Sequence, residues 1–166
     1  MISNAYFHFK VFRQVEKVKL VLTIQLDDMN GKATNFYNTF KAFYNGFTSF
    51  MSDKSFILDA SALLITKVPK NVSIDDIVKK LSTIDHFRGK DLKAAFESFK
   101  NEVISKNKIF VFHSAELGKK NNYENHLLEE INGKTKFWWH DLNRIKISIK
   151  DKVLKRCQDN EDDEFK

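Results

Sequence analysis

The sequence predicts a single α+β domain, in which a mostly antiparallel sheet is packed by three to four amphipathic helices. Two observations carry this prediction. Apolar residues alternate with polar ones in several short segments, which is typical of half-buried strands, and recur every three to four residues in others, which is typical of helices. The 166 residues, 42% of them apolar, suit one domain. We expect residues 1–157 to form it and residues 158–166 to be an acidic, flexible tail.

The chain is expected to begin with a β-hairpin. Apolar side chains stand at the odd positions of 7–11 and at the even positions of 18–26. This is the period of two that places one face of a strand toward a core. The four residues 13–16 between the two segments are short enough for a hairpin connection.

A helix is expected from about Lys32. Five phenylalanines follow helical spacing there and form one stripe: Phe36, Phe40, Phe43, Phe47 and Phe50. Tyr37 and Tyr44 lie beside the stripe and widen it. Gly46 interrupts the pattern, so we expect the helix to end or bend at that residue.

The middle of the chain predicts a second strand pair and two helices. Residues 55–60 and 63–68 are apolar runs that we interpret as strands, closed by the only proline, Pro69. Ser73 with Asp76 three residues later is a variant of the capping box and predicts a helix start. A further helix is expected over 90–105, from its apolar stripe.

The last third predicts one buried strand, a short helix and a terminal strand pair. Residues 108–113 form the apolar run of a buried strand, and residues 123–131 form the helix, which we expect Asn132 and Gly133 to end. Residues 136–140 and 144–149 are expected to form a terminal pair of strands, which completes a sheet made of the N-terminal hairpin, the central strands and these C-terminal strands.

Composition excludes several classes. The lone Cys157 excludes a disulfide framework and a cysteine-rich zinc fold. No stretch approaches about 18 uninterrupted apolar residues, and the N-terminus lacks the pattern of a signal peptide. We therefore expect a cytoplasmic protein with no membrane association.

No enzymatic constellation can be assigned from the sequence. Glycine-rich phosphate loops and the nucleophile-elbow motif are absent, and no histidine pair has metal-ligand spacing. The side chains nearest to a catalytic role are His113 at a strand end, His140 beside Asp141, and Asp59 within an apolar run. No catalytic residue, no metal and no cofactor are therefore predicted.

A basic strand close to two tryptophans suggests a nucleic-acid-binding face. Cations that follow the backbone and an aromatic ring that stacks on a base are how single strands are often held. A solvated polar face with buried tryptophans is the structural alternative. The residues of this face would be Trp138, Trp139, Arg144, Lys146, Lys150 and Lys152.

The acidic tail polarises the charge of the chain. The formal charge is +6, and residues 159–166 hold five acids and one base, so the rest of the chain carries +10. The tail is similar to the acidic tails of bacterial and phage single-stranded-DNA-binding proteins, although Lys166 follows Phe165 here. Long helices interrupt any five-strand barrel pattern, so we assign the chain to no family.

Two functions of different classes remain open. The first is a non-enzymatic intracellular interaction protein, a small subunit or inhibitor of a larger complex, of the kind that phages and mobile elements encode. Its partner would be another protein or a second copy, bound through Tyr37, Tyr44, Phe47 and Phe50. The alternative is a basic protein that binds single-stranded DNA or RNA and is autoinhibited by its tail. A small nuclease using His113 with His126 or His140 is a third hypothesis.

Overall fold

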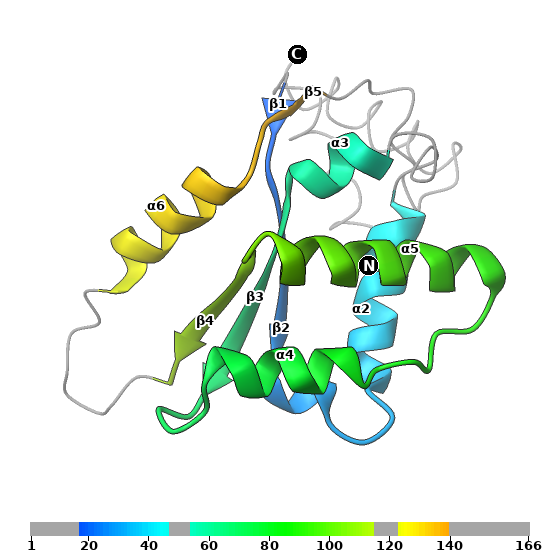
Figure 1. Ribbon diagram of the computed structural model, residues 1–166, viewed down its shortest axis with the longest axis horizontal. Helices are drawn as coiled ribbons and strands as arrows, with labels where there is room; N and C mark the ends of the chain where they lie inside the picture. The colour runs from blue at the N-terminus through cyan, green and yellow to red at the C-terminus, as the bar shows by residue number, and fades with distance from the viewer. Residues whose placement is uncertain (1–16, 47–53, 115–122, 140–166) are drawn as a thin grey trace, which may run out of the picture.

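A computed structural model describes residues 17–46, 54–114 and 123–139 of the chain. Within these residues the centre is a three-stranded parallel sheet in the order β2-β3-β4 (Figure 1). Its strands are β2 (Leu20–Gln25), β3 (Ser61–Val68) and β4 (Ile109–His113). A separate antiparallel pair joins β1 (Lys17–Val18) to β5 (Trp138–Trp139).

Helices connect the parallel strands. The short 3-10 helix η1 (Leu26–Met29), α2 (Thr34–Asn45) and α3 (Lys54–Asp59) lie between β2 and β3 in sequence. The helices α4 (Ile74–Ser82) and α5 (Lys90–Ser105) lie between β3 and β4, and α6 (Tyr123–Lys134) follows β4. Each crossover connects a strand to its next neighbour, and the two crossovers run in the same direction across the sheet. Because such connections are right-handed, their helices lie on the same face of the sheet.

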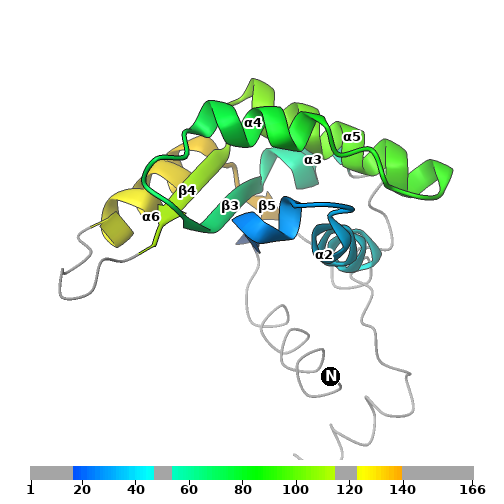
Figure 2. The same cartoon turned by 90° about the horizontal axis from the view of Figure 1, so that it is seen from below.

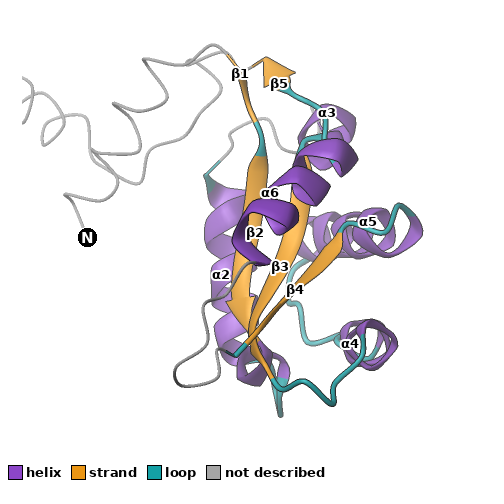
Figure 3. Ribbon diagram, turned by 90° about the vertical axis from the view of Figure 1, so that its left-hand side faces the viewer, coloured by secondary structure: helices purple, strands orange, loops and turns teal. Residues whose placement is uncertain are grey.

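The two faces of the sheet carry cores of different size. In Figure 2, α2, α4 and α5 lie on one side of the strands and α6 lies on the other. The large core contains Phe36 and Phe40 of α2 and Phe96 of α5, all with no exposed area. The small core contains Ala62 and Phe110 from the sheet, with Leu127 and Ile131 from α6. Figure 3 shows α6 standing apart from α4 and α5.

The predicted α+β class is confirmed, but the predicted mostly antiparallel sheet is wrong. The sequence indicated a hairpin at residues 7–26, whose first half lies outside the described residues. The second half, β2, pairs in parallel with β3, with Leu20 opposite Ser61 and Gln25 opposite Thr66. Adjacent parallel strands need a crossover, which α2 and α3 supply.

The predicted strand at residues 55–60 is also wrong, because α3 occupies this segment. A short apolar run cannot be assigned to helix or strand by periodicity alone. Here Ile57 and Leu58 are buried, whereas Phe56 is 64% exposed. The segment therefore buries one side of a helical turn.

The other predicted elements that fall within the described residues are found with small changes in their bounds. The predicted strand at residues 144–149 and the predicted tail at residues 158–166 lie outside the described residues. Ser73 caps α4 as expected, because its hydroxyl accepts a hydrogen bond from the Asp76 amide at 3.2 Å. The helix α6 continues to Lys134 and thus contains Gly133, which was expected to end it. None of the helices in the described ranges combines the length and the apolar character that crossing a membrane requires.

Candidate binding cleft along the edge of strand β4

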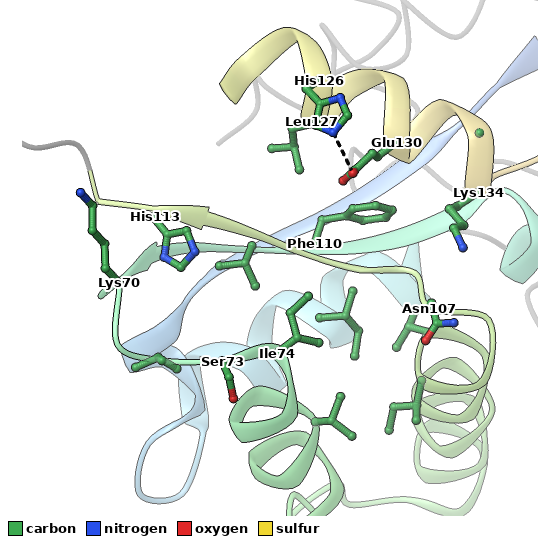
Figure 4. Close-up of a pocket in the computed structure, with 17 residues that line it drawn as sticks. Lys70, Ser73, Ile74, Asn107, Phe110, His113, His126, Leu127, Glu130 and Lys134 are labelled. Carbon is green, nitrogen blue, oxygen red and sulfur yellow. Dashed lines mark ion pairs between the residues drawn. The ribbon is translucent and has the colours of Figure 1, made fainter. Parts of the chain in front are cut away.

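A cavity follows the outer edge of β4 (Figure 4). Its volume is about 840 Å³, which is within the range of small-molecule sites. One wall comes from α4 and the end of α5, and the other from α6. The strand itself contributes Ile109, Phe110, Val111 and His113 to the lining.

The backbone of β4 has one edge without a partner among the described strands. The Leu63 amide donates to the Lys108 carbonyl at 3.0 Å, and the Ser114 amide donates to the Val68 carbonyl at 3.1 Å. Backbone groups of successive residues point to alternate sides of a strand. The amides and carbonyls of Ile109, Val111 and His113 therefore point away from β3, into the cleft.

The two walls differ in chemistry. The wall from α4 and α5 is apolar, and its members include Val78, Val103 and Ile104. Ile74, in the first turn of α4, also lines the cleft and is 51% exposed. The α6 wall adds one apolar side chain, Leu127, to the polar His126, Glu130 and Lys134. An occupant would thus meet an apolar side and a polar side.

The two histidines of the cleft are held separately. His113 is half-buried, and its Nδ1 lies 3.2 Å from the Val68 carbonyl. A carbonyl oxygen only accepts, so Nδ1 carries the proton and Nε2 is the basic nitrogen in the neutral ring. His126 Nε2 lies 3.1 Å from Glu130 Oε1. Figure 4 shows the two rings on different sides of β4, so the strand lies between these members of the hypothetical acid–base pair.

Asp59, the carboxylate candidate, belongs to an ionic cluster at the other end of β4. Its two oxygens lie 3.0 Å from Lys106 Nζ and 3.3 Å from Lys136 Nζ. The hydrogen bond from Lys106 lowers the pKa of Asp59, burial opposes this in part, and Lys136 adds to the lowering. The carboxylate is therefore held in its charged form by two cations.

The centre of this cluster is the buried Lys108. Only 2% of the residue is exposed, and its Nζ donates to the Leu58 carbonyl at 3.0 Å and to Glu102 Oε1 at 2.8 Å. A third acceptor is the Asp59 carbonyl at 3.3 Å. The ammonium thus caps the last carbonyls of α3 and neutralises Glu102. Lys108 at the start of β4 therefore links α3 and α5 through these hydrogen bonds.

Glu102 completes the cluster. Burial raises the pKa of Glu102, but hydrogen bonds from Lys106 and Lys108 outweigh it, so the pKa lies below its ordinary value. The same contacts raise the pKa of Lys106, Glu102 contributing more than Asp59. Across residues 17–46, 54–114 and 123–139, no three His, Cys, Asp or Glu side chains are grouped so that they could hold a metal ion.

The basic and aromatic face is described in part. Trp138 and Trp139 form β5, with Trp139 opposite Lys17 and Trp138 opposite Val18. Arg144, Lys146, Lys150, Lys152 and His140 lie outside the described residues. Phe137, which the sequence analysis did not single out, is 50% exposed. Lys17 Nζ and Lys19 Nζ lie 4.4 and 4.5 Å from its ring centroid.

Of the four aromatic residues predicted to bind a partner, two are described by the structure and two are not. Phe47 and Phe50 lie outside the described residues. Tyr37 and Tyr44 are partly buried and pack against the large core, Tyr37 with its ring 5.1 Å from that of Phe87. The cleft residues Ile74, Ile109 and Val111 were not predicted as a site. Their sequence signal is an apolar strand without the lysines or proline that protect many edge strands.

No family model, curated protein or solved structure matches the chain. The described residues define a small α+β protein with a cleft along one edge of a parallel sheet.

Proposed function

We propose that the chain is a non-enzymatic interaction protein, a small subunit or inhibitor of a larger complex, and that it binds its partner in the cleft beside β4. The observation that carries the proposal is the outward-pointing backbone of Ile109 and Val111 at the base of an open cleft. An unpaired strand edge is a template for an added strand, and many peptide-binding domains use one.

The exposed Ile74 supports the same proposal. This side chain lines the cleft in the first turn of α4 and is 51% exposed, although Ile77 on the next turn is buried and Val78 is half-buried. An apolar side chain at the mouth of a cleft loses unfavourable contact with water when a partner covers it. Such anchors are where binding energy concentrates in protein interfaces.

Affinity purification from the native host tests the proposal with a matched pair of variants. Ile74→Lys places a charge in the cleft, whereas Leu128→Lys makes the same change at an apolar residue that is 65% exposed on α6 and does not line the cleft. We expect nuclease-resistant capture of a partner by the wild type and Leu128→Lys, and at least tenfold less by Ile74→Lys. Equal capture by the two variants would contradict the proposal.

Binding of single-stranded nucleic acid is the second candidate function. It is favoured by the half-exposed Phe137 ring, over which the ammonium groups of Lys17 and Lys19 lie. A base could stack on this ring if the ammonium groups moved off it to meet phosphates.

A titration of single-stranded DNA at several salt concentrations tests this candidate. Affinity should fall steeply with salt, rise when the chain is cut after Gln158, and fall severalfold in Phe137→Ala. The control Phe56→Ala removes an exposed ring of α3. No binding at low salt by the shortened chain would remove this candidate.

A further inference from the structure

The cleft has the form of a slot for one more strand. Its base is the edge of β4 that has no partner among the described strands, and helices stand on both sides of it: α4 and α5 on one, α6 on the other (Figure 4). Figure 3 shows the same arrangement from the side. A strand added beside β4 would continue the parallel sheet between the two helical layers, with its backbone bonded to Ile109 and Val111.

The walls specify what such a strand would carry on its two faces. Side chains of a strand alternate between its faces. Those on one face would meet the apolar wall of Val78, Val103 and Ile104. Those on the other face would meet the α6 wall, with Glu130 and Lys134. Apolar residues at every second position and polar residues between them satisfy both walls.

One end of the slot specifies a charge. Lys134 and Asn107 lie at this end of the cleft (Figure 4). The one carboxylate of the lining, Glu130, is already paired with His126 at 3.1 Å. A carboxylate on the occupant would therefore be favoured near Lys134.

We propose that the occupant is an acidic extended segment of a partner protein, with apolar residues at alternate positions and Asp or Glu at the end that lies near Lys134, which adds as a fourth strand beside β4. This inference rests on the proposed function, because it names the chemistry of the partner at the same cleft.

Selection from a display library of random peptides tests the proposal with the full chain as bait. The peptides are about nine residues long, enough to pair with the five residues of β4 and to extend past both ends. The wild type should enrich sequences with apolar residues at alternate positions and an acidic residue at one end. Individual winners are then synthesised and titrated against the variants.

Val111→Pro tests the strand addition. The Val111 amide points away from β3, so a proline there removes a donor of the cleft without removing a bond of the existing sheet. We expect affinity for a selected peptide to fall at least tenfold. Circular dichroism and thermal unfolding show whether this variant is folded.

Lys134→Glu tests the charge without altering the strand. It should lower affinity for an acid-flanked peptide severalfold and raise affinity for the same peptide with lysine at the flank. Lys93→Glu, at an exposed residue of α5 outside the cleft, is the matched control and should change affinity little. If both charge reversals weaken binding equally, general attraction to a basic chain explains it and the proposal is overturned.

The failures of the two proposals are distinguishable. If Ile74→Lys loses the partner but the library yields no alternating acidic sequence, the cleft binds a partner of other chemistry and this inference alone is wrong. If Ile74→Lys retains the partner, the proposed function itself is wrong.

Discussion

The two faces of the parallel sheet differ in how much of their apolar surface is closed. On the face of α2, α4 and α5, aromatic rings interlock, with Phe87 stacked on Phe96 at 3.8 Å and Phe40 edge-on to Phe96 at 5.3 Å. On the face of α6, four buried residues are flanked by the half-buried Leu64 and Phe112. We therefore expect the face of α2, α4 and α5 to supply most of the stability, whereas the face of α6 is covered by one helix beside the cleft.

The largest effect that tests this comparison is expected for Phe96→Ala. The ring has no exposed area and contacts Phe36, Phe40 and Phe87. Its removal should lower the free energy of unfolding by about 3–5 kcal/mol, because the cavity cannot close among rigid rings. Urea denaturation followed by circular dichroism measures the loss. A loss below about 2 kcal/mol would show that the large core is less tightly packed than its contacts indicate.

A loss of similar size is expected for Lys108→Ala, at the point where the two faces meet. The substitution leaves Glu102 without its buried cation and the carbonyls of α3 without their donor. Breaking a buried ion pair from one side costs about 3–5 kcal/mol, and Lys106, whose Nζ lies 2.9 Å from Glu102 Oε1, offsets part of this loss. Lys108→Met keeps the aliphatic volume, so the difference between the two variants in thermal unfolding separates lost packing from lost charge. Equal stability of the wild type and Lys108→Ala would contradict the structural role that we assign to Lys108.

A smaller effect is expected for Leu127→Ala in the small core. Leu127 is 8% exposed and borders the cleft, so the space it leaves is open to water and partly relaxes. We expect a loss of about 2 kcal/mol, the low end for buried leucines. The same chemical denaturation assay compares it directly with Phe96→Ala. A loss as large as that of Phe96→Ala would mean that the two faces contribute equally, and the comparison would fail.

The sequence predicts the large face better than the small one, for physical reasons. The spacing of Phe36 and Phe40 and of Phe96 and Phe99 is a local property of a helix, so periodicity identifies those residues as core. The pairing of strands is not local. Leu20 lies opposite Ser61 because the crossover through α2 and α3 brings β3 beside β2. The sequence of β2 alone does not distinguish this parallel pairing from a hairpin.

The order of the elements did contain the missing information. Strands that alternate with helices favour a parallel sheet, and continuous apolar runs such as 109–112 are typical of strands buried on both faces. The cleft was the feature least accessible to prediction, because it depends on which edge of the sheet has no neighbouring strand among the described residues. Only the assembled sheet shows that Ile109 and Val111 have no described strand beside them, whereas His113 was identified correctly as a strand end.

The smallest expected effect is on acid stability and concerns the ionic cluster at the junction of the faces. Hydrogen bonds from lysines lower the pKa of Asp59, with an ordinary value of 3.8, and that of Glu102, with an ordinary value of 4.5, against the effect of burial. A carboxylate with a lowered pKa stabilises the folded state fully above its ordinary value. That contribution is lost as the pH falls below 4.5 and through the lowered pKa values, because protonation breaks the contacts with the lysines.

Urea midpoints measured from neutral pH downward should therefore fall in this range. The fall should be shallower in Asp59→Asn than in Glu129→Gln, which changes an exposed carboxylate of α6. Identical acid limbs in the two variants would show that the cluster does not hold the faces together, and the junction would then depend on packing alone.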